Sequence, residues 1–60
     1  MTPQEIKEIR TRLGISQEDF ARLLGISLQS IGRWERGKAK PSRLAVKRLK
    51  EIATKEKHDS

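Results

Sequence analysis

Two short segments with helical apolar spacing meet at Gly25 in the stretch LLGISLQSIGRW, which runs from Leu23 to Trp34. Apolar residues recur every three or four positions on both sides of this glycine, so the pattern predicts a helix on each side. An isolated helix of fewer than about 12 residues is marginal in water, and neither segment is longer than that. The two helices therefore need a core shared with other parts of the chain. The glycine between them can adopt a turn conformation that is unfavourable for other residues.

The chain has only 60 residues and no cysteine, which restricts how such a core can be built. This length allows one small domain, whose folding buries only about 60% of the unfolded surface. Disulfides and thiolate metal sites are excluded, and a single histidine, His58, does not make a zinc site. We therefore expect packed helices to supply the stability, with no metal and no cofactor.

Local signals predict where four helices begin and end. Thr2 can cap the first helix, with proline at the first helical position and Glu5 completing a capping box. Later helices are expected to start after serine caps and to stop at glycines. The caps are Ser16, Ser27 and Ser42, and the glycines are Gly14, Gly25 and Gly37. Because no segment alternates like a strand, we expect an all-α domain of four helices over residues 1–53 and a flexible, frayed polar tail at 54–60.

The apolar residues at helical spacing indicate the core. The expected inner positions are Ile6, Ile9, Arg10 and Leu13, then Phe20, Ala21, Leu23, Leu24, Ile26, Ile31 and Trp34, then Leu44 or Ala45 with Leu49 and Ile52. Trp34 could instead be an exposed interaction residue, but its spacing from Ile31 favours the core. Ala21 is small where two helix axes would cross. The pattern over residues 17–36 therefore predicts a helix-turn-helix unit. In such a unit the second helix, here residues 28–36, enters the major groove of DNA.

Positive charge is concentrated in one third of the chain. The formal net charge is +6, and residues 1–32 are balanced, whereas residues 33–50 hold eight Lys or Arg against Glu35 alone. Such a block fits a polyanion, either nucleic acid or an anionic membrane surface. It could equally be a solvated face. The last helix has few apolar residues, and the core needs them. We therefore do not expect it to bind a membrane.

The combination of motifs resembles a known family. The stretch ISQEDFARLLGISLQSIGRWERGKAKPS closely resembles the phage-repressor and Cro type of helix-turn-helix domain, the XRE family of bacteria and their phages. The motifs are S-Q-x-x-F-A, the glycine turn, S-I-x-x-W-E-x-G and K-x-K-P, and the resemblance covers roughly residues 5–52. It implies a compact lambda repressor-like domain. The short chain is also similar to helix-turn-helix antitoxins.

The resemblance implies a role for each matching residue. Leu28, Gln29, Ser30 and Arg33 match outward positions of the recognition helix that reach base edges or adjacent phosphates. The implied phosphate contacts are Gln17, Ser27, Arg36, Lys38, Lys40 and Arg43. Arg10 and Glu35 match a partly buried ion pair that joins the first helix to the third in some members; a solvated surface pair is the alternative.

Side-chain chemistry leaves some of these roles open. Gln29 can donate and accept together, which suits adenine, while Arg33 can bind guanine with two hydrogen bonds or can bind a phosphate. Leu28 could press against a thymine methyl group, or it could fold back onto Leu24 or the turn. Gln17 is also a good helix-start residue without any DNA.

The leading hypothesis is sequence-specific binding of double-stranded DNA by a transcriptional regulator. We expect a repressor, a homodimer on a palindromic operator, located in the cytoplasm at the nucleoid of a bacterium or phage host. The alternative is a DNA-binding antitoxin or adaptor whose main partner is a toxin or another protein. No signal peptide or membrane span is expected. An enzyme is not expected, because the serines lie at helix starts, where capping explains them.

Overall fold

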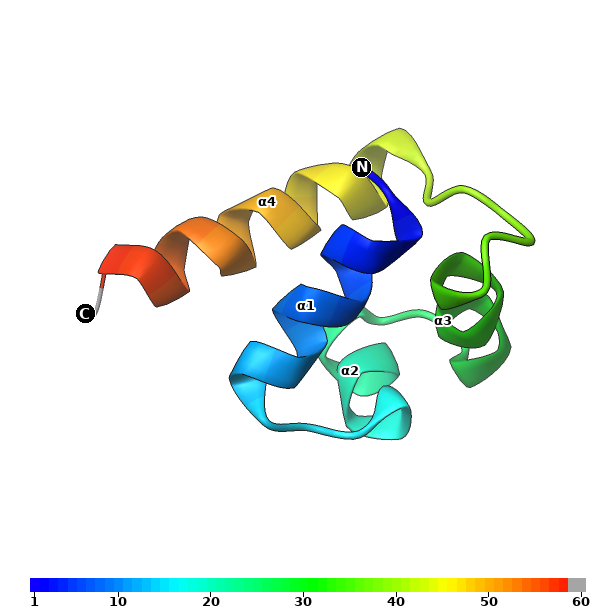
Figure 1. The fold of residues 1–60 in the computed structure, drawn as a ribbon, viewed down its shortest axis with the longest axis horizontal. Helices are drawn as coiled ribbons and strands as arrows, with labels where there is room; N and C mark the ends of the chain where they lie inside the picture. Colours follow the sequence, from blue (N-terminus) through cyan, green and yellow to red (C-terminus); the bar gives the residue numbers. More distant parts are fainter. Residues whose placement is uncertain (59–60) are drawn as a thin grey trace.

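A computed structural model describes residues 1–58 of the chain and the side chains of residues 1–55. Its four helices are α1 (Pro3–Leu13), α2 (Gln17–Leu24), α3 (Leu28–Glu35) and α4 (Arg43–His58). The short α2 and α3 follow α1 closely, and the longer α4 extends toward one end of the molecule while α3 lies at the other (Figure 1). No strand occurs within the described range, so the expected all-α fold is confirmed.

The helix starts follow the predicted caps. At α1 the Thr2 hydroxyl accepts from the Glu5 amide at 3.1 Å, and the Glu5 carboxylate accepts from the Thr2 amide at 2.7 Å. This is the reciprocal capping box that the sequence predicts, with Pro3 in the first helical position. The serine hydroxyls at the other three starts each accept from the backbone amide three residues later. These serines are Ser16, Ser27 and Ser42.

Gly25 makes the turn between α2 and α3. Its φ is +70°, in the left-handed region that other residues adopt only with strain, and its amide donates to the carbonyl groups that end α2. No atom lies within 4 Å of the position that a Cβ would take, so the conformation of the backbone alone favours glycine here. The helix α3, which we expect over residues 28–36, ends at Glu35 with Arg36 as its C-terminal cap, one residue earlier than expected.

The core lies where all four helices meet. Phe20, Ile31 and Leu49 are fully buried, and Ile6 is nearly so. Trp34 is only 6% exposed, which confirms it as a core residue rather than an exposed interaction residue. Because α2 and α3 bury their inner faces against α1 and α4, two helices that are too short to persist alone become stable in this fold.

The structure corrects one expected core position, in α2, and decides between two neighbouring candidates in α4. Leu23 is 50% exposed, so its assignment to the inner face of α2 was wrong; α2 buries Phe20, Ala21 and Leu24 instead. In α4 the choice between two neighbours is settled by burial, because Ala45 is 8% exposed and Leu44 is 68% exposed.

The helix α4 continues to His58, so residues 54–58, for which we expect a flexible tail, extend the helix. The flexibility of this segment stays a prediction, and residues 59 and 60 lie outside the described residues. Among the helices of residues 1–58, none is long and apolar enough to cross a membrane.

Candidate nucleic-acid interface

One face of α3 points away from the core. Ile31 and Trp34 hold the helix on its inner side, whereas Gln29 and Arg33 are exposed and Leu28 is 48% exposed. The side chain of Leu28 is therefore not part of the core. Three of the four residues expected to read bases are therefore exposed: Gln29 and Arg33, which share one helix face, and Leu28 at the start of α3.

Ser30 differs from the other three because it is half-buried and takes part in the cap of α3. Its amide donates to the Ser27 hydroxyl at 3.2 Å, and the two hydroxyl groups lie 2.9 Å apart. Ser27, expected to contact a phosphate, is thus the N-terminal cap of the helix. A role of either serine at DNA stays a prediction.

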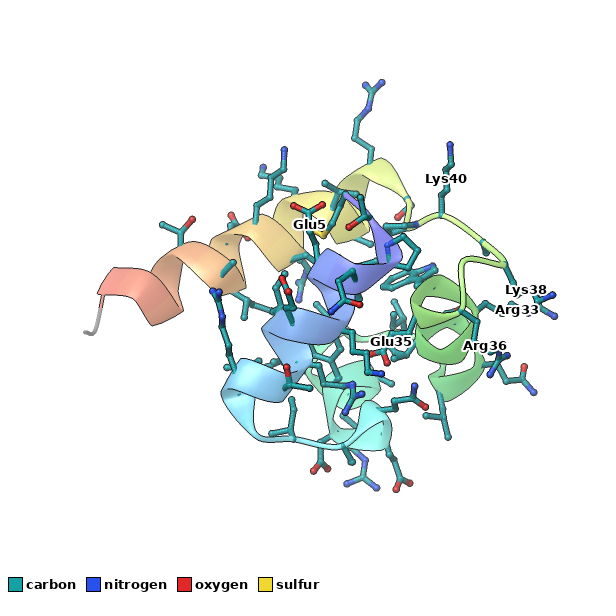
Figure 2. All side chains as sticks on the ribbon, in the orientation of Figure 1. Glu5, Arg33, Glu35, Arg36, Lys38 and Lys40 are labelled. Carbon is teal, nitrogen blue, oxygen red and sulfur yellow. The ribbon has the colours of Figure 1, made fainter. Side chains whose placement is uncertain are left out.

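Cationic side chains border the exposed face of α3. Arg33, Arg36 and Lys38 project outward on the α3 side of the molecule, and Lys40 projects from the loop that follows (Figure 2). Arg43 is the first residue of α4 and is also exposed. Within the described side chains none of these five cations takes part in an ion pair. Their charges are therefore available to a polyanion.

Gly32 leaves room for Arg36 on the recognition helix. A Cβ added at Gly32 would lie 3.3 Å from Nη1 and 3.7 Å from Cζ of Arg36, so the guanidinium rests against the backbone of α3. An alanine at position 32 would require this guanidinium to shift by a few tenths of an ångström. This contact was not predicted from the sequence, although a glycine inside a helix and an arginine four residues later are on the same helix face.

Arg10 and Glu35 form a bidentate ion pair between α1 and α3. Nε of Arg10 lies 2.7 Å from Oε2 of Glu35, and Nη2 lies 3.1 Å from Oε1. The two side chains are 16% and 5% exposed, so the pair is shielded from solvent rather than on the surface. Nη1 of Arg10 also donates to the Ile15 carbonyl at 3.1 Å. One guanidinium therefore fixes α3 and the loop between α1 and α2 relative to α1.

These contacts set the protonation of Glu35. Burial raises the pKa of its carboxyl group, but the hydrogen bonds from Arg10 and Gln17 and the charges of Arg10 and Lys7 outweigh burial. The pKa of Glu35 therefore lies below its ordinary value of 4.5. The hydrogen bond to Glu35 likewise raises the pKa of Arg10. Both groups stay charged near neutral pH.

Gln17 joins this pair, which the sequence analysis did not predict. Its Nε2 donates to Oε1 of Glu35 at 3.0 Å, so the start of α2 is tied to the end of α3. Its spacing could have indicated this, because Gln17 precedes Phe20, Ala21 and Leu24 by three, four and seven residues and so shares the inner face of α2. Contact of Gln17 with a phosphate stays a prediction.

Comparison with known proteins finds one matching family model and several similar sequences. A family model described as Helix-turn-helix matches residues 6–53, which include α2, α3 and most of α4. The HTH-type transcriptional regulator YiaG of Escherichia coli K12 is 38% identical over 48 residues, which are 80% of this chain and 50% of that protein. Antitoxin HigA-2 of Vibrio cholerae is 40% identical over 50 residues, which are 83% of this chain and 48% of that protein.

A modification enzyme shares the same segment. The Type II methyltransferase M.SsoII of Shigella sonnei is 47% identical over 45 residues, which are 70% of this chain but only 12% of the enzyme. The chain spans about half the length of YiaG and HigA-2, at 50% and 48%. No solved structure gave a significant match.

Proposed function

This chain belongs to the helix-turn-helix family, and we propose that it binds double-stranded DNA sequence-specifically, with α3 in the major groove. The observation that carries the proposal is the outward face of α3, where Gln29 and Arg33 are exposed on a helix whose inner side is fixed in the core. Base readout needs polar side chains on a rigid support, and this face provides both.

Each exposed residue of α3 fits a different base. Gln29 can hydrogen-bond the N6 and N7 atoms of adenine, and Arg33 can bind O6 and N7 of guanine with two parallel bonds. Leu28, which is 48% exposed, can contact the methyl group of thymine. Arg33 bound to a phosphate instead would supply affinity without base preference.

The surrounding polar groups fit the DNA backbone. The exposed cations Arg36, Lys38, Lys40 and Arg43 lie at the end of α3, in the loop and at the start of α4, where they can follow the phosphates on one side of the groove. The N-terminal amides of α2, next to Gln17, can bind a further phosphate. Such contacts hold the protein in register on the duplex but carry no sequence information.

The proposed biological role is a transcriptional regulator, and specifically a repressor, of a bacterium or phage. It acts as a homodimer on a palindromic operator, at the nucleoid in the cytoplasm. Support comes from the name of the relative YiaG, a transcriptional regulator. Two half-sites read by two copies of α3 would lie about 34 Å apart, one turn of the double helix.

Selection from a random duplex library at near-physiological salt, followed by sequencing of the bound pool, tests the proposal. Enrichment of an inverted repeat with about one helical turn between half-sites is the expected result. Binding that enriches no sequence and disappears as salt rises would contradict sequence-specific recognition, because it reports phosphate contacts alone.

A second function is favoured by one comparison. HigA-2 of Vibrio cholerae, 40% identical over 50 residues, is named as an antitoxin. We propose as the alternative that this chain is the DNA-binding part of an antitoxin whose main partner is a toxin. Affinity purification with the products of neighbouring genes separates the two, because the antitoxin should co-purify with one adjacent small protein and a plain repressor should not.

A further inference from the structure

A groove lies between α2 and α4, and no residue of the candidate DNA interface lines it. It has a volume of about 860 Å³ and is lined by one residue of α2, Leu23, and by residues of α4 between Lys47 and Lys55. The C-terminal half of α4 and α3 lie toward opposite ends of the molecule (Figure 1). Because no residue of α3 lines the groove, a ligand there need not contact α3.

Apolar side chains from both helices line the groove. Leu23 is 50% exposed, one of the largest exposed apolar side chains of residues 1–55. Ile52 of α4 is only partly buried against the core and also lines the groove. A nucleic-acid backbone presents mainly charged phosphates to a protein, which cover apolar side chains poorly, whereas the apolar face of an amphipathic helix covers them well.

The rim of the groove is strongly basic. Lys47, Arg48, Lys50 and Lys55 line it against a single carboxylate, that of Glu51. In the part of the chain whose side chains are described, these five residues form no ion pair. An apolar floor with an unpaired basic rim is complementary to leucines flanked by glutamates or aspartates.

We propose that this groove binds an acidic amphipathic helix of another protein. Residues 47–55 extend about 12 Å along α4, at about 1.5 Å per residue, which matches about two turns of a partner helix. A contact of this size is small, so we expect the interaction to be weak rather than permanent. A second copy of this chain is disfavoured, because a symmetric contact through the groove would place the same cations opposite one another.

Fluorescence anisotropy of the full chain with a labelled peptide tests the inference. The probe is a helical peptide of about 16 residues with leucines on one face and flanking glutamates; the controls carry the same residues in scrambled order, or lysines in place of the glutamates. The expected result is binding of the first peptide only. Failure of that peptide to bind, or equal binding of the scrambled peptide, would overturn the inference.

Variants separate the groove from general charge. Arg48→Glu with Lys55→Glu should weaken peptide binding about tenfold or more, while the matched pair Lys38→Glu with Lys40→Glu in the loop should change it less than about twofold. Leu23→Ser should also weaken peptide binding, and thermal unfolding checks that each variant folds. Equal effects of the two charge pairs, or no effect of Leu23→Ser, would show that the groove is not the binding site.

Two further measurements test other occupants. Duplex DNA from the selected pool should not displace the peptide; displacement would mean that the groove binds nucleic acid. Sedimentation of the protein alone should show no dimer that Leu23→Ser disrupts, since such a dimer would assign the groove to a second copy. Leu23→Ser should keep its DNA affinity, so failure of the groove and failure of DNA binding are separate results.

Discussion

At the scale of single residues, Glu35 connects the three helices that position the recognition surface. Its carboxylate accepts two hydrogen bonds from Arg10 of α1 and one from Gln17 of α2, while its own backbone ends α3. The side chain is 5% exposed, so its charge depends on these partners rather than on water. The orientation of α3, which we propose to enter the major groove, therefore depends on residues that need not touch DNA.

Removing Arg10 should destabilise the fold severely. Arg10→Ala leaves the buried carboxylate of Glu35 without its cation, and the expected loss is about 3 kcal/mol of the free energy of unfolding. Arg12→Ala, an exposed position on the same helix, should change it by less than about 0.5 kcal/mol. Urea unfolding of both variants measures the difference, and equal losses would contradict a buried ion pair.

The stability should depend on pH through Glu35. Because its pKa is lowered in the folded state, the stabilisation it provides is complete above the unfolded value of 4.5 and is lost as pH falls through the folded pKa. Thermal unfolding from about pH 7 to about pH 3 should show the native protein and Glu35→Gln converging at acid pH. A difference in melting temperature between the two proteins that stays constant over this pH range would contradict the lowered pKa of Glu35. Glu5, whose pKa is lowered mainly by the Thr2 amide, is present in both proteins.

At the scale of elements, local signals predicted more than packing signals did. All four helix starts were predictable because a cap involves residues three apart in the chain. The exposure of Leu23 was not predictable, because Leu23 lies at the edge of the apolar stripe of α2 and the position of α4 leaves it exposed. For Gln17, helical spacing indicated the inner face of α2 but not the partner, because Glu35 lies 18 positions later in the chain.

The turn between α2 and α3 should be sensitive to the loss of glycine. Gly25→Ala forces a Cβ into a φ of +70° and should lower the free energy of unfolding by about 1 to 2 kcal/mol. Gly32→Ala is the control, since Gly32 lies inside α3, where alanine is favoured by up to about 1 kcal/mol. Its Cβ would meet only the mobile end of Arg36 at 3.3 Å.

The changes in the free energy of unfolding caused by the two glycine variants should therefore differ in sign, or at least clearly in magnitude. Chemical denaturation followed by circular dichroism measures both. If Gly25→Ala were as stable as the native protein, the left-handed turn would not be needed for the helix-turn-helix unit.

At the scale of the whole molecule, charge and apolar surface are distributed over two separate regions. The exposed cations around α3 and the loop lie at one end, and the C-terminal half of α4 extends toward the other (Figures 1 and 2). The groove is lined by Leu23 of α2 and by α4, and none of those cations lines it. The sequence showed the excess of charge in residues 33–50 but not this division, because neighbouring residues of α4 point in different directions. In our two proposals, one small domain thus presents one surface to DNA and a second surface to a protein.

DNA binding should be strongly dependent on salt. If each subunit neutralises about three to five phosphates, the logarithm of affinity should fall with the logarithm of salt concentration at a slope of about −3 to −5 per subunit. Lys38→Ala and Lys40→Ala should weaken all sequences alike and make the slope less negative by about 1 each. Arg33→Ala should instead relax the base preference at one position of the half-site.

Titration of labelled operator and of unrelated duplex at several salt concentrations separates these effects. Arg12→Ala, an exposed cation of α1 outside the candidate interface, is the control and should leave the slope unchanged. A slope near zero would contradict binding through the cations around α3. A uniform loss of affinity in Arg33→Ala, without any change in base preference, would move Arg33 from base readout to the phosphate contacts, and Gln29 and Leu28 would then carry the specificity of α3.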